Sequence, residues 1–77
     1  MSDTIDRVKR VVAETLRVDP DRVIENARFV EDLGAESIQS VELVAAFEEE
    51  FDIDMDEEEA LQVKKVGDAV NFIERYL

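Results

Sequence analysis

The sequence contains no cysteine and no histidine, and it has only two glycines and one proline among its 77 residues. Without cysteine there is neither a disulfide nor a thiolate nucleophile, and without histidine there is no imidazole base. Zinc also loses the ligands that it uses most often in proteins. The core must therefore be held by packing alone, and hydrolysis by a serine–histidine pair is excluded.

Long apolar runs are missing as well. The longest unbroken run, Leu43 to Phe47, is far shorter than the roughly 20 residues that a membrane-spanning helix requires. The first residues are acidic where a secretory signal peptide would be basic. We therefore expect a cytoplasmic protein without a membrane span or an export signal.

Basic residues are absent from the middle of the chain. Between Phe29 and Val63 there are 13 acidic residues and no Lys or Arg, whereas residues 1–28 hold 6 acids and 6 bases, so the net charge of -12 lies in this middle segment. A chain this acidic repels the phosphates of nucleic acids and of anionic lipid headgroups. We expect no nucleic-acid partner, but protein partners that carry basic patches.

The length and the spacing of apolar residues predict the architecture. A chain of 77 residues forms one small domain, residues 1–77, and its apolar share of 45% is ordinary for a folded protein. The apolar residues recur at helical spacing, which predicts an all-α fold: a small bundle of three main helices plus one short helix. These helices are expected near residues 3–17, from Ser37 to about Phe51, from Asp56 through about Leu61, and from about Val66 to Tyr76.

The predicted connection over residues 18–36 is unusually long for a compact domain. Asp19 followed by Pro20 predicts an N-cap and one short helical turn near its start. We expect the rest to be functional and to be anchored by the apolar residues Val23, Ile24, Phe29 and Leu33.

The helix predicted from Ser37 has two apolar stripes. One consists of Leu43, Val44, Phe47 and Phe51 and is the predicted core face. The other consists of Ile38, Val41 and Ala45, with acidic residues between them. Periodicity alone leaves two interpretations open for this second stripe, a wider core face or a surface for a partner.

Metal binding and carboxylate catalysis compete for the acidic segment. The segment Asp52-Ile53-Asp54-Met55-Asp56 copies the opening of an EF-hand calcium loop, but Glu57 stands where that loop has glycine and Val63 where it has glutamate. The charge field leaves loose binding of divalent cations open as an alternative. We predict no specific metal site and no catalytic residues, because a solvated acidic face is the simpler interpretation.

Ser37 has two possible roles at the start of its helix. Serine is a preferred N-cap residue, and local chemistry favours that role. The same position suits an attached phosphate, because unpaired backbone N–H groups and the helix dipole favour negative charge there.

The segment from Phe29 to Leu43, FVEDLGAESIQSVEL, resembles the signature of acyl carrier proteins, whose motif is Asp-Ser-Leu after Leu-Gly-Ala. The likeness continues through residues 47–53 and the acidic stretch 56–59, and length, charge and helix order agree throughout. It implies an acyl-carrier-like fold and a carrier protein, not an enzyme. Ser37 would bear 4'-phosphopantetheine through a phosphodiester, installed by a phosphopantetheinyl transferase that uses coenzyme A. Acyl groups would travel on this arm as thioesters between enzymes of fatty acid, lipid or specialised acyl pathways.

The resemblance also implies a docking face on the helix that begins at Ser37. A monomeric carrier would present this face to the transferase and to acyl-transferring or synthase enzymes with basic patches, while the interior between the helices shelters the acyl chain. The expected contact residues are Glu36, Ile38, Val41, Glu42, Ala45, Glu48 and Glu49.

Five positions depart from the family pattern. Glu36 and Ile38 stand where Asp and Leu are usual, Gln39 where an acid is common, Ala45 where Met is frequent, and Asp56 where proline is frequent. They suggest a specialised pathway and leave the acyl group open. The alternatives are a peptidyl or aminoacyl carrier, which Gly34-Ala35-Glu36 disfavours, an unmodified acidic interaction module, and, as the weakest, a calcium sensor.

Overall fold

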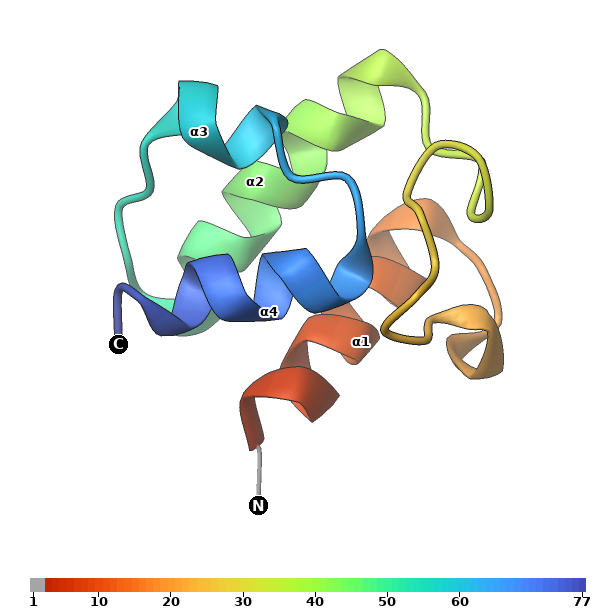
Figure 1. Ribbon diagram of the computed structural model, residues 1–77, viewed down its shortest axis with the longest axis horizontal. Helices are drawn as coiled ribbons and strands as arrows, with labels where there is room; N and C mark the ends of the chain where they lie inside the picture. Colours follow the sequence, from red (N-terminus) through yellow and green to blue (C-terminus); the bar gives the residue numbers. More distant parts are fainter. Residues whose placement is uncertain (1–2) are drawn as a thin grey trace.

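The computed structural model describes residues 3–77, which form four α-helices and one short 3-10 helix (Figure 1). Three of the α-helices are long and one is short, so the predicted all-α architecture is confirmed. The elements in chain order are α1 (Asp3–Leu16), η1 (Pro20–Arg22), α2 (Ser37–Phe51), α3 (Glu57–Leu61) and α4 (Val66–Glu74).

The ends of the helices follow from local backbone chemistry. α1 stops at Leu16 because Arg17 adopts a left-handed conformation with φ 58°, and α2 ends at Phe51 because Asp52 does the same with φ 55°. α3 starts after Asp56, whose Oδ1 accepts a hydrogen bond from the Glu59 N–H at 3.1 Å, as the predicted cap requires. α4 ends at Glu74, two residues before the predicted end at Tyr76.

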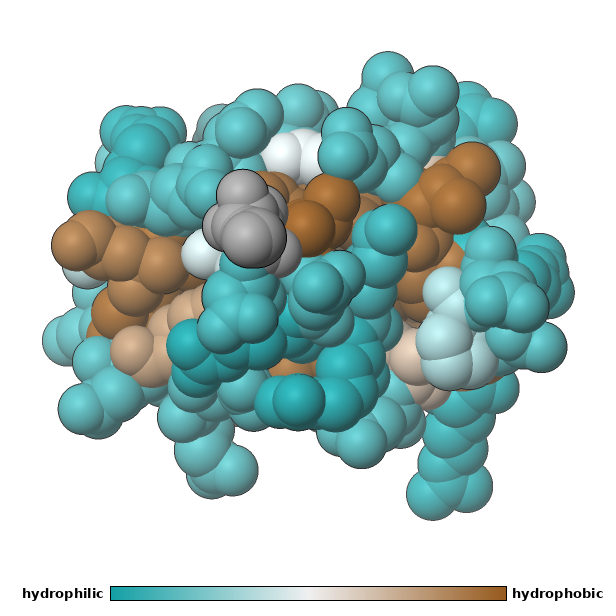
Figure 2. Space-filling model, turned by 90° about the horizontal axis from the view of Figure 1, so that it is seen from below, coloured by the Kyte–Doolittle hydropathy of each residue, from teal (hydrophilic) through white to brown (hydrophobic). Residues whose placement is uncertain are grey.

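The surface carries all of the charge of the described residues. No polar or charged side chain within residues 3–77 is buried. Figure 2 shows a largely hydrophilic face, on which apolar side chains lie in patches between polar ones. Across the same 75 described positions, residues 3–77, no helix is long and apolar enough to cross a membrane.

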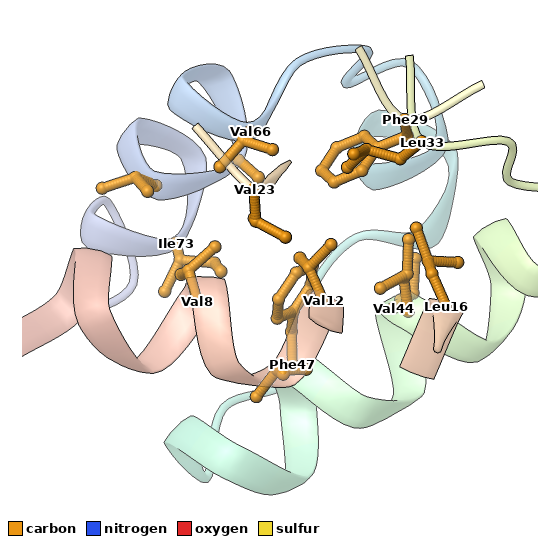
Figure 3. Close-up of a cluster of buried hydrophobic side chains, with 14 of the residues drawn as sticks. Val8, Val12, Leu16, Val23, Phe29, Leu33, Val44, Phe47, Val66 and Ile73 are labelled. Carbon is orange, nitrogen blue, oxygen red and sulfur yellow. The ribbon is translucent and has the colours of Figure 1, made fainter. Parts of the chain in front are cut away.

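The core is one cluster to which three helices and the connection between α1 and α2 contribute. Figure 3 shows Val8 and Val12 of α1 facing Phe47 of α2 and Ile73 of α4. The predicted core face of α2 is confirmed, since all four of its residues are buried. Burial of this kind contributes about 1.5–3 kcal/mol per large apolar side chain.

The long connection, residues 18–36, is anchored as predicted, with one exception. Val23, Phe29 and Leu33 are buried, together with two alanines that the sequence analysis did not select, Ala27 and Ala35. Ile24 was predicted to be an anchor, and this prediction is wrong, because its side chain is 53% exposed. Val23 follows η1 and fills the core position, where it is only 1% exposed, and the side chain of the adjacent Ile24 lies outside the core.

The same connection is joined by backbone hydrogen bonds to the segment between α3 and α4 and to the first residues of α4. The Phe29 N–H donates to Lys64 O at 2.9 Å, the Val66 N–H to Ala27 O at 3.0 Å, and the Gly67 N–H to Glu25 O at 2.9 Å. This short antiparallel contact fixes the position of residues 25–29 beside the start of α4. It therefore also limits where the chain can go as it approaches Ser37.

Candidate functional site

Ser37 is the first residue of α2, and its side chain is exposed. The helix begins one residue earlier than it would with a serine cap, because Glu36 occupies the N-cap position with φ -90° and ψ 166°. The interpretation of Ser37 as the cap is therefore wrong. Within residues 3–77 no side-chain hydrogen bond engages the Ser37 hydroxyl, which leaves it available for chemistry.

Gln39, one of the departures from the family pattern, takes part in capping. Its Oε1 accepts a hydrogen bond from the Glu36 N–H at 2.9 Å. This is the reciprocal half of a capping box, in which the third helical residue reaches back to the N-cap backbone. Gln39 therefore stabilises the turn that presents Ser37, a role that the sequence analysis missed.

The loop before Ser37 is closed by Arg28 and Asp32. The Asp32 Oδ2 accepts hydrogen bonds from the Arg28 backbone N–H at 2.8 Å and from the Arg28 Nε at 3.1 Å. The Arg28 side chain lowers the pKa of Asp32, and the backbone N–H of Arg28 adds to this effect. The Asp32 carboxylate in turn raises the pKa of Arg28. An ionised Asp32 thus holds the loop in its folded form.

Gly34 completes this loop. Its φ is 72°, in the left-handed region that favours glycine, and its N–H donates to Val30 O at 3.0 Å. The next N–H, of Ala35, donates to Phe29 O at 2.8 Å. The chain therefore turns tightly and enters α2 directly, which fixes the direction in which Ser37 leaves the surface.

The second apolar stripe of α2 faces solvent. The side chain of Ile38 is 67% exposed and that of Val41 46% exposed, and Ala45 is exposed as well. The interpretation that this stripe only widens the core face is therefore wrong. Three of the predicted acidic contact residues, Glu36, Glu42 and Glu49, are also exposed on the same helix or at its N-cap.

Glu48 differs from the other predicted contact residues. It is half-buried, and its Oε2 accepts a hydrogen bond from the Met55 N–H at 2.8 Å. The carboxylate thus holds the connection between α2 and α3. Glu48 thus has a structural role in the fold, as does Glu36, whose side chain accepts a hydrogen bond from the Gln39 backbone in the capping box.

Glu50 joins the end of α2 to α1. Its Oε2 lies 2.8 Å from the Arg7 Nε and 2.7 Å from an Arg10 Nη, and an Arg7 Nη also donates to the Glu50 backbone carbonyl at 2.6 Å. The Arg7 guanidinium lies 4.4 Å from the centre of the Phe51 ring. Hydrogen bonds from Arg7 and then Arg10 lower the pKa of Glu50. The sequence analysis did not select this cluster, because it depends on residues that are 40 and 43 positions apart.

A small apolar cavity of about 60 Å³ opens beside α2. Its wall includes Leu43 and Phe47 of α2, Ala60 of α3 and Phe72 of α4, and Ser40, Glu31 and Lys64 are the polar residues among those that line it. This is a small cavity, since an engineered apolar cavity of roughly 150 Å³ is needed to hold one benzene molecule. A longer apolar ligand could enter only if the walls moved apart.

The acidic segment does not gather into a metal centre. Among residues 3–77 there is no group of three or more His, Cys, Asp or Glu side chains that could hold a metal ion. The predicted likeness to an EF-hand opening at Asp52 to Asp56 therefore does not extend to the arrangement of the carboxylates. Asp52 ends α2, and Asp56 caps α3.

Comparison with known proteins gives consistent matches along the chain. The family model described as "Phosphopantetheine attachment site" matches residues 6–73. An acyl carrier protein of Phenylobacterium zucineum (strain HLK1) is 52% identical over 77 residues, which cover 100% of this chain and 98% of that protein. An acyl carrier protein of Caulobacter vibrioides (strain NA1000 / CB15N) is 53% identical over 73 residues, which cover 95% of this chain and 94% of that protein.

Proposed function

The chain belongs to the acyl carrier protein family, and we propose that Ser37 carries its 4'-phosphopantetheine group through a phosphodiester bond. Members of this family are carriers and not enzymes, and 4'-phosphopantetheine is their prosthetic group. The observation that carries the assignment to Ser37 is its exposed side chain at the first position of α2, two residues after the Leu33-Gly34-Ala35 motif.

The residues around Ser37 fit a phosphodiester. The first backbone N–H groups of a helix have no partners within the helix, and the helix dipole favours a negative group beside them. Ser37 and Ile38 supply such N–H groups at the start of α2. Glu36 and Asp32 oppose an anion, so the phosphate must extend into solvent, as the exposure of Ser37 permits. The group supplies a terminal thiol, which this cysteine-free chain lacks.

We propose that the exposed face of α2 is where the transferase and acyl-handling enzymes dock. Ile38 and Val41 would fill apolar depressions on the partner, and Glu36, Glu42, Ala45 and Glu49 would lie around them, with the acids facing basic patches. Glu48, also predicted to be a contact, would act mainly by holding the connection to α3. Electrostatic attraction of this kind raises association rates and weakens with salt.

The proposed function also includes the acyl cargo and the cavity that would hold it. We infer that acyl groups are held as thioesters and shuttled between enzymes of a fatty acid, lipid or specialised acyl pathway. The apolar cavity beside α2 supports an aliphatic cargo, because the residues that line it are mostly apolar. A short chain would fit with little change, while a longer one would require the cavity to widen.

We further propose that residues 1–77 act as one domain, as a monomer, in the cytoplasm. The single buried cluster that joins all three long helices supports one domain. Repulsion between molecules that each carry a net charge of -12 supports a monomer. Gel filtration coupled to light scattering would test the monomer.

The attachment is tested by intact-protein mass spectrometry after incubation with coenzyme A and a promiscuous phosphopantetheinyl transferase. We expect one phosphopantetheine-sized mass gain in the wild type and in Ser40→Ala, and none in Ser37→Ala. Ser40 is a matched control, because it lies one helical turn from Ser37 and lines the cavity. If the wild type is not modified, the alternative of an unmodified interaction module is favoured. If Ser40→Ala loses the mass gain, the attachment site is Ser40 and not Ser37.

The docking face is tested with the same reaction. Ile38→Ala and Glu42→Lys should each raise the KM for the carrier with little change in kcat, because they weaken association and leave Ser37 in place. Glu14→Lys introduces the same charge change on the exposed face of α1 and should have a much smaller effect. Equal effects of Glu14→Lys and Glu42→Lys would mean that net charge alone, and not this face, governs docking.

A further inference from the structure

α3 is the least buried of the helices that line the cavity. None of its five residues is buried, and only Ala60 is half-buried. Ala60 and Leu61 both line the cavity, and Leu61 is 37% exposed. An element that buries so little apolar surface gains little from packing, so its position depends on the hydrogen bonds at its ends.

The start of α3 is held by one side chain from α2 and one from the residues that follow α4. The Met55 N–H donates to Glu48 Oε2 of α2 at 2.8 Å, and the Asp56 N–H donates to the hydroxyl of Tyr76 at 3.1 Å. Asp56 is also the residue that caps α3. The Tyr76 hydroxyl therefore accepts a hydrogen bond from the N-cap residue of α3.

Tyr76 is itself fixed to α4. Its N–H donates to Ile73 O at 2.9 Å, and its ring meets the Phe72 ring edge to face, with the ring centres 5.4 Å apart and the planes at 66°. Phe72 is buried and lines the cavity. Tyr76 therefore links the two helices that line the cavity: its ring packs on Phe72 of α4, and its hydroxyl binds Asp56 at the start of α3.

We propose that Tyr76 is a positioning residue that holds α3 against α4 and so determines how readily the cavity widens to admit an acyl chain. This inference rests on the proposed function. The cavity of about 60 Å³ is too small for a long chain, so a wall must move, and α3 is the wall with the least burial to lose. Movement of α3 away from α4 breaks the bond between Asp56 and Tyr76. The bond therefore opposes loading with long acyl groups.

The first test uses the unmodified protein and needs no acyl group. Tyr76→Phe removes the hydroxyl and keeps the ring, so the contact with Phe72 remains. We expect hydrogen exchange of the Asp56, Glu59 and Ala60 amides, measured by NMR, to become about two- to tenfold faster, since a typical hydrogen bond has that net effect. Exchange in the buried part of α1 should not change.

The matched control for this test is Arg75→Gln. The Arg75 guanidinium lies 5.6 Å from the centre of the same Phe72 ring, and no hydrogen bond from its side chain to α3 is present within residues 3–77. This variant should leave exchange in α3 unchanged. Equal exchange in wild type and Tyr76→Phe, or an equal increase in Arg75→Gln, would overturn the proposal.

The second test measures loading directly. The melting temperature is compared between the phosphopantetheine form and the octanoyl form, for wild type and for Tyr76→Phe. If loading breaks the bond, only the wild type loses it, so the stabilisation by octanoyl should be several degrees larger in Tyr76→Phe. Equal shifts would overturn the role in loading. If Ser37 is not modified, the proposed function and the role in loading fail together, while the exchange experiment still decides whether Tyr76 holds α3.

Discussion

At the scale of single residues, the presentation of Ser37 depends on neighbours with backbone roles. Gly34 supplies a left-handed turn, and Gln39 satisfies the Glu36 N–H. Neither role requires a contact with a partner. Substitutions at these positions should therefore act first on the stability of the fold.

Gly34→Ala should destabilise the protein by about 1–2 kcal/mol, the cost of placing an L-residue in the left-handed region. A Cβ at this position would meet no atom within 4 Å, so steric overlap adds nothing. Gly34→Asn should cost less, because asparagine enters this region more readily. Urea denaturation of the three proteins measures the difference, and a Gly34→Ala protein as stable as the wild type would contradict the argument.

Gln39→Ala should lower the free energy of unfolding by about 0.5–1.5 kcal/mol, because the Glu36 N–H loses its acceptor. Gln39→Glu keeps an acceptor at the same position and should retain most of the stability. The comparison requires urea midpoints at neutral pH. A loss in Gln39→Glu as large as in Gln39→Ala would show that the hydrogen bond to Glu36 is unimportant.

At the scale of elements, the sequence correctly predicted those helix boundaries that depend on the local pattern of residues. The apolar spacing predicted both ends of α2 correctly, and Asp56 predicted the start of α3. The errors arose where two local options compete or where distant segments meet. Serine and glutamate could each occupy the cap of α2, and only the bond between Glu36 and Gln39 decides between them. The pairing of residues 25–29 with residues 64–67 joins segments that are far apart in the sequence, and no local pattern encodes it.

The contact between α1 and α2 at Glu50 should make stability depend on pH. Because Arg7 and Arg10 lower the pKa of Glu50 in the folded state, the ionised carboxylate stabilises the fold above the unfolded pKa of about 4.3. That contribution is lost as the pH falls from there through the lower folded pKa. The stability difference between wild type and Glu50→Gln should therefore be present at pH 7 and should shrink in acid.

Glu49→Gln is the matched control for this measurement, because it removes the same charge from an exposed neighbouring position on α2. Urea midpoints between neutral and acidic pH would be compared for the three proteins. If Glu49→Gln and Glu50→Gln show the same pH dependence, the effect comes from general charge repulsion. A difference confined to Glu50→Gln identifies the ion pairs with Arg7 and Arg10 as its source.

At the scale of the whole molecule, the dominant feature is a net charge of -12 on a chain with a radius of gyration of 11.0 Å. The longest extent of the molecule is 29 Å. At about 0.01 M salt the screening length is roughly 30 Å, so every acidic residue repels every other across the molecule. At about 1 M salt the length is roughly 3 Å, and only ion pairs in contact still interact.

Salt should therefore stabilise the protein even though it weakens the ion pairs of Glu50 and Asp32. These pairs are exposed or partly exposed and contribute little each, whereas the repulsion involves the whole acidic segment. Relief of about 1 kcal/mol would raise the melting temperature by roughly 4–8 °C in a domain of this size. A variant with Glu42→Gln and Glu49→Gln has less repulsion to relieve, so its melting temperature should rise less with salt. A wild-type melting temperature that is constant or falls between low and high salt would mean that local ion pairs, and not the summed field, govern the stability of this carrier.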